Sequence, residues 1–180
     1  SNKRFLKNTD DMLSKIAQKQ ESKNIKSHYD IGNDFYKLWL DDTMSYSCAY
    51  FKEPNNTLYE AQINKIEHTL KKLDLKEGEK LLDIGCGWGW LSIMAAQKYG
   101  VKVVGITISE EQCKKAKERV KELGLEDKIE IRLQNYQDLE FENYFDKVVS
   151  VGMFEHVGKE NLGLYFMKVK QVLKPGGSML

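Results

Sequence analysis

The sequence has 180 residues, enough for one globular domain that buries roughly 70% of the surface of its unfolded chain. Its formal net charge of +1 gives no bulk electrostatic signal for nucleic acid or membrane, and no apolar run approaches the roughly 20 residues of a transmembrane helix. The three cysteines form no C-x-x-C pair, which favours reduced thiols and a cytoplasmic protein.

The amino-terminal segment is the most basic part of the chain. Residues 1–28 contain seven Lys or Arg against three acidic residues. Phe5, Met12 and Ile16 recur at helical spacing, which predicts an amphipathic helix with a basic polar face. Such a helix can lie on an anionic membrane surface, or it can pack on its own domain with a solvated charged face. The sequence leaves both alternatives open.

The next segment, residues 26–51, is rich in aromatic residues. Residues 30–34 form a turn cluster, and Asp34 is a candidate N-cap for a short helix that ends near Leu40. Residues 44–51 mix Ser, Cys and Tyr without the alternation of a strand. Polar and aromatic groups outside regular structure favour a pocket wall over a packing face.

Helices and strands are predicted to alternate through the rest of the chain. Apolar runs predict strands at residues 81–84, 101–106, 129–133 and 145–151, and helical spacing predicts helices at residues 58–73, 91–99, 109–124 and 161–173. The sequence KPGG at residues 174–177 predicts a turn before a fifth strand that is just beginning at residue 180. This order predicts an α/β fold with a Rossmann-like parallel sheet and helices on both faces.

The stretch at residues 81–91, LLDIGCGWGWL, joins an apolar strand to the start of a helix. A Cβ at its alternating glycines would block close backbone approach or oppose a positive φ, so free N–H groups are expected against a ligand. Asp83 adds a carboxylate at the carboxyl end of the strand, where open α/β sheets bind ligands. The loop does not match the dinucleotide-binding fingerprint, which needs Gly or Ala where this chain has Trp90. The alternative to a ligand-binding loop is a tight strand–helix turn that binds no ligand. The glycines are Gly85, Gly87 and Gly89.

Five stretches in order along the chain carry a family resemblance: HYDIGNDFY, YSCAYF, LLDIGCGWGWL, VVGITIS followed by EQ, and SVGMFEHVG. Together they resemble the cyclopropane-fatty-acyl-phospholipid synthase family, which includes the mycolic acid cyclopropane synthases, from about Lys26 to Leu180. The resemblance implies a seven-stranded S-adenosylmethionine (SAM)-dependent methyltransferase sheet. It places an amino-terminal helical lid at residues 1–73 and a SAM-binding core at residues 74–180. Since residue 180 falls in the fifth strand, the chain is expected to be incomplete at its carboxyl end.

The resemblance also implies roles for particular residues. The residues expected to bind SAM are Tyr46, Ser47, Asp83, Gly85, Gly87, Gly89, Thr107, Gln112, Asn135 and Tyr136. The residues expected to serve catalysis are Tyr29, Cys48, Glu155 and His156, and no metal ligand is expected. Cys48 and Glu155 would help to hold a bicarbonate ion, and the π face of Tyr29 would stabilise a carbocation. His156 could take part directly or only orient Glu155.

Some of these residues also have purely structural interpretations. Gln112 could complete a capping box with Ser109 instead of reaching a ligand. Cys48 could be a small buried hydrophobe, and Glu155 could be a solvated loop carboxylate. Asn135 stands where relatives often carry an acid, although its carbonyl can still accept a hydrogen bond from the adenine amine.

The function implied is transfer of a methylene group from SAM to the double bond of unsaturated acyl chains of membrane phospholipids, giving cyclopropane fatty acids. Two alternatives stay open. One is another SAM-dependent methyltransferase that makes methyl-branched or methylene lipids or methylates small amines, and the other is a non-catalytic SAM-binding fragment. The expected partners are phospholipids at the inner membrane surface, reached transiently from the cytoplasm, and no nucleic acid. A homodimer is left open.

Overall fold

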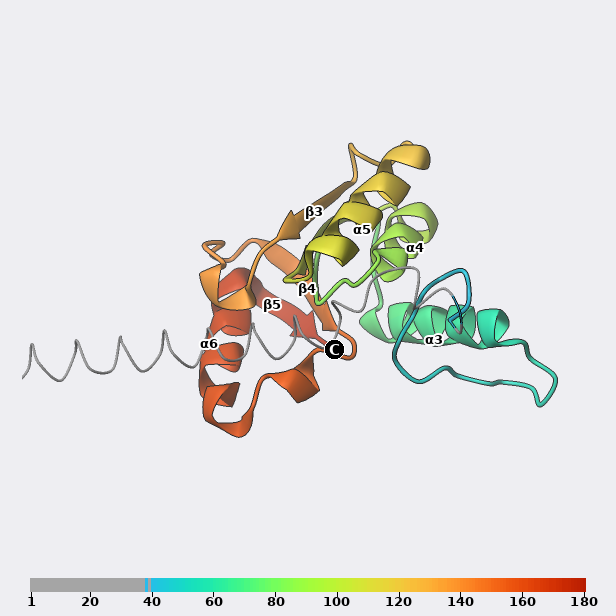
Figure 1. The fold of residues 1–180 in the computed structure, drawn as a ribbon. Helices are drawn as coiled ribbons and strands as arrows, with labels where there is room; N and C mark the ends of the chain where they lie inside the picture. The colour runs from blue at the N-terminus through green and yellow to red at the C-terminus, as the bar shows by residue number, and fades with distance from the viewer. Residues whose placement is uncertain (1–37, 39) are drawn as a thin grey trace, which may run out of the picture.

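A parallel sheet of five strands forms the centre of the computed structural model, which describes Leu38 and residues 40–180 (Figure 1). The strands are β1 (Lys80–Ile84), β2 (Lys102–Thr107), β3 (Ile129–Leu133), β4 (Phe145–Ser150) and β5 (Leu173–Met179). Their order is β3-β2-β1-β4-β5, and all neighbouring strands are parallel. The chain therefore adds strands on one side of β1 and then switches to the other side. The predicted α/β fold is confirmed.

Helices cover both faces of this sheet, as predicted. The helices are α3 (Leu58–Leu73), α4 (Trp90–Tyr99), α5 (Glu110–Glu122) and α6 (Leu162–Val172), with short 3-10 turns η1 (Tyr136–Asp138), η2 (Phe154–His156) and η3 (Lys159–Asn161). Apolar residues of α3, α4 and α5 share one core cluster with Leu81 of β1, and residues of α6 and η1 share the other with Leu82. Both leucines are fully buried, because a central parallel strand is covered on both faces.

The predicted start of the fifth strand is wrong, because β5 begins at Leu173, before the residues 174–177 that were expected to form a turn ahead of it. The pairing of β4 with β5 passes from Phe145 with Leu173 to Lys147 with Ser178, with an irregularity between them. The extra residues of β5 are therefore absorbed as a bulge, and Gly176 has a φ of +80° within it. The Pro and Gly residues therefore lie in the bulge, between the paired positions Leu173 and Ser178.

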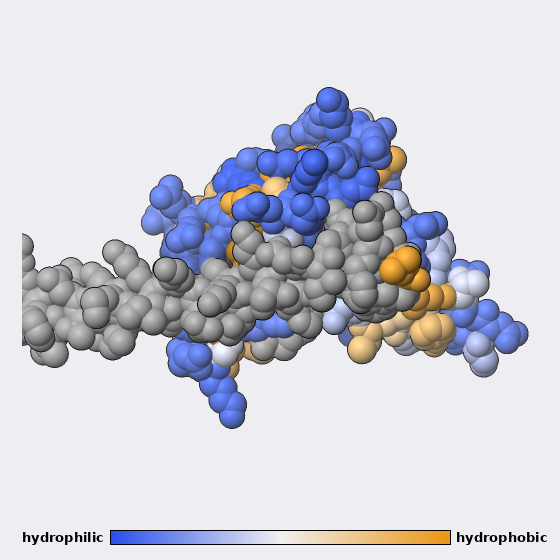
Figure 2. All heavy atoms as spheres, viewed as in Figure 1, coloured by the Kyte–Doolittle hydropathy of each residue, from blue (hydrophilic) through white to orange (hydrophobic). Residues whose placement is uncertain are grey.

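The segment before α3 and the start of that helix expose several large apolar and aromatic residues. Figure 2 shows mainly hydrophilic residues over α5, whereas hydrophobic residues gather beside α3. The exposed large apolar and aromatic residues of this segment and of the first turn of α3 are Leu38, Tyr46, Tyr50, Phe51, Leu58 and Tyr59. In the part of the chain that is described, no helix is long and apolar enough to cross a bilayer.

Several predictions concern residues outside the described part. The basic amphipathic helix, the N-cap at Asp34 and the role of Tyr29 all belong to this group. The division of the chain at residue 73 stays a prediction. Within the described residues, α3 contributes Ile66, Leu70 and Leu73 to the same core as the sheet.

Candidate active site

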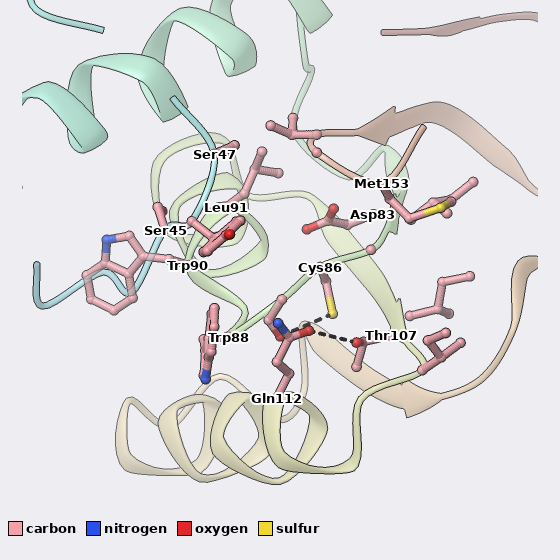
Figure 3. Close-up of a pocket in the computed structure, with 18 of the residues that line it drawn as sticks. Ser45, Ser47, Asp83, Cys86, Trp88, Trp90, Leu91, Thr107, Gln112 and Met153 are labelled. Atoms are coloured by element: carbon pink, nitrogen blue, oxygen red, sulfur yellow. Dashed lines mark hydrogen bonds between the residues drawn. The ribbon is translucent and has the colours of Figure 1, made fainter. Parts of the chain in front are cut away.

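A cavity of about 570 Å³ opens at the carboxyl ends of the strands (Figure 3). Its volume lies within the roughly 300–1,000 Å³ usual for small-molecule sites. The loops after β1, β2, β3 and β4 all contribute to its lining. Since the strand order reverses between β1 and β4, the cavity lies at the topological switch point, where α/β sheets bind ligands.

The three glycines of the loop after β1 serve different purposes. Gly85 and Gly87 line the cavity, and Gly89 does not. All three have positive φ, but an added Cβ would meet Met153 Cβ at 2.7 Å from Gly85 and Ala116 Cβ at 3.0 Å from Gly89. At Gly87 an added Cβ would meet no protein atom within 4 Å. The missing side chain of Gly89 lets α4 pack on α5, and the expected contact of Gly89 with SAM stays a prediction.

The expectation that this loop presents free N–H groups to a ligand is wrong in part. The N–H groups of Gly85 and Cys86 both donate to the Ile106 carbonyl at 2.9 Å, and that of Gly89 donates to the Cys86 carbonyl at 2.9 Å. These bonds fix the loop to the end of β2 and to itself. A ligand therefore meets a preformed loop, in which three of the N–H groups already have protein acceptors.

Asp83 is a buried acid at the end of β1, only 2% exposed, and it lines the cavity. Its Oδ2 accepts a hydrogen bond from Ser92 Oγ at 2.7 Å. Burial raises the pKa of Asp83 to about 6, and the Ser92 hydroxyl opposes that rise. A cationic or hydroxyl group of a ligand would stabilise this carboxylate, so the residue suits the role predicted for it.

Thr107 and Gln112 form a buried polar pair on the wall next to β2. Thr107 Oγ1 donates to Gln112 Oε1 at 3.0 Å, and both residues line the cavity. The Ser109 side chain accepts from the Gln112 backbone N–H at 3.3 Å, so one half of the predicted capping box is present. A full capping box would also have the Gln112 side chain accept from the Ser109 backbone N–H, but this side chain accepts from Thr107 instead. This geometry favours the ligand-facing alternative for Gln112.

Asn135 and Tyr136, after β3, also line the cavity. Asn135 Oδ1 accepts from the Gln137 N–H at 3.0 Å and so caps η1. The oxygen predicted to accept from adenine therefore already has one donor, although a carbonyl oxygen can accept two hydrogen bonds. The Tyr136 ring is 4% exposed and packs edge-on against Tyr165 at 5.1 Å, so most of it belongs to the core.

Residues 41–48, which we call the cover segment, form the wall opposite the strand ends. None of them lies in a helix or strand, and residues 43–48 line the cavity. Cys48 is exposed, so its interpretation as a small buried hydrophobe is wrong. Tyr46 and Ser47 line the cavity as predicted for ligand-binding residues.

Sequence reasoning missed three side chains that bond to this cover segment. They are Gln62 and Lys65 of α3 and Arg119 of α5. A signal existed for the first, since Gln62 interrupts the apolar stripe that α3 presents at helical spacing through Ile66 and Leu70. Nothing local marked Lys65 or Arg119, because charged residues are common on both helices.

The loop after β4 contributes Met153 and His156 to the cavity. The His156 N–H donates to the Met153 carbonyl at 2.9 Å within the turn η2. Glu155 lies in the same turn, and its catalytic role stays a prediction. The structure therefore brings Cys48 and His156 to one cavity, although 108 residues separate them in the sequence.

The comparisons with known proteins agree with this geometry. The family model described as mycolic acid cyclopropane synthetase matches residues 16–180. The chain is 51% identical over 163 residues to a probable fatty acid methyltransferase of Pseudomonas putida, covering 91% of this chain and 41% of that protein. It is 51% identical over 155 residues to the cyclopropane-fatty-acyl-phospholipid synthase of Escherichia coli K12, covering 86% of this chain and 39% of that protein.

A solved structure shows the same fold with a ligand. The mycolic acid cyclopropane synthase CmaA1, complexed with SAH and CTAB, superposes with a TM-score of 0.82 at 39% identity, covering 88% of this chain and 55% of that one. The chain thus spans about two fifths of the length of the two curated relatives, at 41% and 39%.

Proposed function

Because the chain belongs to the mycolic acid cyclopropane synthetase family, we propose that the protein is a SAM-dependent enzyme that adds a methylene group across the double bond of unsaturated phospholipid acyl chains. The product is a cyclopropane fatty acid. One observation carries the proposal: a single cavity is lined both by residues predicted to bind SAM and by Cys48 and His156, which are predicted to serve catalysis.

The cavity residues fit SAM. The open space beside Gly87 admits a ligand against the backbone, and the buried Asp83 carboxylate suits an ammonium group. We infer that Asp83 binds the amino group of the methionine part and that Thr107 and Gln112 bind the ribose hydroxyls. Asn135 and Tyr136 would lie beside the adenine. When bound, SAM supplies an electrophilic methyl group on a sulfonium.

The protein's own contribution is to position the alkene and to exclude water, because an isolated alkene is a weak nucleophile. Methyl transfer leaves a carbocation on the acyl chain. Aromatic faces such as that of Tyr46, which lines the cavity, would stabilise this cation by about 0.5–2 kcal/mol each. The hydrophobic residues beside α3 offer apolar surface close to the cover segment, which suits an acyl substrate.

A proton must leave the transferred methyl group before the ring closes. A carboxylate placed directly against the cation risks alkylation, so we infer that Glu155 and Cys48 bind a bicarbonate ion that is able to accept this proton. His156 lines the cavity one residue after Glu155 and would orient it. We expect Glu155→Gln to lower the cyclopropanation rate by about 10²-fold or more. A full rate in this variant would contradict the assignment.

A second candidate function is methylation of an acyl chain without ring closure. It is favoured by the 51% identity to the probable fatty acid methyltransferase of Pseudomonas putida. The two functions differ in what happens to the cation: loss of a proton with ring closure gives a cyclopropane, whereas other outcomes give a methyl branch or a methylene group.

The test is to incubate the complete protein with SAM and vesicles of unsaturated phospholipid and to examine the lipid by proton NMR. Upfield cyclopropane protons support the proposed function. A methyl branch or a methylene group supports the second candidate. Measurable SAM binding with no lipid product would overturn both and leave a SAM-binding module.

A further inference from the structure

We propose that Gln62 and Lys65 of α3 are positioning residues that fix the cover segment over the cavity and thereby set the affinity for SAM. The proposal rests on the proposed function in taking SAM as the ligand of this cavity. Neither side chain belongs to the strand-end loops that form the opposite wall. Both reach across to residues 45–48 from a helix that begins ten residues after Cys48.

Gln62 uses its amide group on two carbonyls of the cover segment. Its Nε2 donates to the Ser45 carbonyl at 3.0 Å and to the Ser47 carbonyl at 3.1 Å. Residues 45–48 lie in no helix or strand, so their carbonyls need donors from elsewhere. A primary amide has two N–H donors, and both are used here.

Gln62 is also costly to bury. It is 3% exposed among apolar residues of α3, and within the described residues its Oε1 is buried and accepts no hydrogen bond. A leucine at this position would avoid that desolvation cost and would continue the apolar stripe. The two bonds to the cover segment are the favourable interactions that offset it.

Lys65 bonds to the same part of the cover segment from the next turn of α3. Its Nζ donates to Ser47 Oγ at 2.9 Å and to the Ser47 carbonyl at 3.3 Å. The side chain is largely buried, which lowers its pKa to about 8, while Asp41 and Cys48 oppose that shift. No carboxylate of the described residues forms an ion pair with it. Lys65 is also one of the residues that line the cavity.

The other end of the cover segment is fixed separately. Arg119 of α5 donates to the carbonyls of Asp42 at 2.9 Å and Thr43 at 3.4 Å, and also to the Trp88 carbonyl of the glycine loop at 3.2 Å. Met44 follows with a φ of +53° and packs on Trp88. The segment is thus anchored to the glycine loop at residues 42–44, and among the described residues α3 supplies the donors to the carbonyls of residues 45 and 47.

The test compares Gln62→Leu and Lys65→Met with a matched control, Lys72→Met, which removes an exposed lysine from the same helix. In the complete protein, affinity for SAH is measured by calorimetry and by the fluorescence of Trp88 and Trp90, which line the cavity. We expect each test variant to weaken SAH binding about tenfold and to raise the KM for SAM by a similar factor, with kcat changed less than threefold. The control should match the wild type.

Two further variants separate positioning from folding. Lys65→Arg keeps a cationic donor, so we expect its SAH affinity to be within about threefold of the wild type. In the double variant Gln62→Leu/Lys65→Met, the loss of SAH affinity should be smaller than the product of the two single losses, because both residues bond to Ser47. Wild-type SAH affinity in both single variants would overturn the proposal, as would equal losses in Lys65→Met and Lys65→Arg. A wild-type protein that does not bind SAH would instead overturn the proposed function itself.

Discussion

The two walls of the cavity are built in different ways. The wall at the strand ends is fixed by backbone hydrogen bonds, such as those from Gly85 and Cys86 to Ile106, and by strand register. The cover segment is fixed by side chains of α3 and α5 that bond to its carbonyls. The first wall therefore depends on backbone-to-backbone hydrogen bonds, and the second depends on side chains that bond to the backbone of the cover segment. Substitutions that affect one wall at a time test this difference.

The largest effect on stability is expected at Gly85 in the strand-end wall. Gly85→Ala forces a side chain at a φ of +76° and brings its Cβ to 2.7 Å from Met153 Cβ. Left-handed strain and overpacking together should lower the free energy of unfolding by about 3 kcal/mol, as measured by urea denaturation. Gly124→Ala is the matched control, because its φ is +63° with no atom near the added Cβ. A loss no larger than that of the control would show that the loop is not rigid.

The next effect concerns Asp83 and pH. Its folded-state pKa of about 6 lies above the ordinary value near 3.9, so the folded state favours the protonated acid. Protonated Asp83 therefore adds about 2–3 kcal/mol to the free energy of unfolding below about pH 4. This contribution is lost as the pH rises through 6. Asp83→Asn should remove this component from the pH dependence of unfolding without ligand. An identical pH profile in the variant would contradict the buried position of the carboxyl group.

A smaller loss is expected at the anchored end of the cover segment. Arg119→Lys keeps the charge but cannot reach the three carbonyls that the guanidinium bonds at once. We expect the free energy of unfolding to fall by about 1–2 kcal/mol, as measured by thermal and urea denaturation, and SAH binding to weaken as well. Lys121→Met, an exposed change on the same helix, serves as the control. Unchanged SAH affinity would mean that this end of the segment does not shape the cavity.

The smallest effect on stability is expected at Gly87, which faces open space. Gly87→Ala adds a Cβ with no protein atom within 4 Å, at a φ of +57°. We therefore expect the free energy of unfolding to fall by only about 1 kcal/mol. Binding of SAH should nevertheless weaken by about tenfold or more, because the methyl group occupies space at the cavity wall. Calorimetry on both glycine variants would show whether stability and binding separate in this way. If SAH bound Gly87→Ala as tightly as the wild type, the loop would not approach the ligand.

The predictions that succeeded depended on local patterns. Helix α3 was predicted with the bounds it has, since its Thr57 cap and apolar stripe are both encoded within the helix. The parallel sheet followed from strands alternating with helices, and the glycine loop was found at the end of β1. The sequence was less informative about β5, because this strand begins before the Pro-Gly-Gly segment, which forms a bulge in its pairing with β4.

Long-range contacts explain what sequence reasoning missed. Gln62 and Lys65 bond to residues 15 to 18 positions away, and Arg119 bonds to residues 76 and 77 positions away, so no local pattern announces them. Whether the Gln112 side chain completes a cap with Ser109 or faces a ligand was likewise open in the sequence. In the fold, the end of β2 brings the Thr107 hydroxyl to its amide oxygen at the cavity wall. The roles of Tyr29 and Glu155 stay predictions.

The sequence by itself determined the order of strands and helices, the position of the glycine loop and the family to which the chain belongs, because these are carried by short motifs and by periodicity. Only the tertiary structure decided which residues share one cavity and what fixes each of its walls. It separated Gly87, which faces the ligand space, from Gly89, which lets two helices pack. It also showed that side chains of α3 and α5 donate to the carbonyls of the cover segment. Carbonyls outside helices and strands need donors from other parts of the fold, and only the tertiary structure shows which side chains supply them.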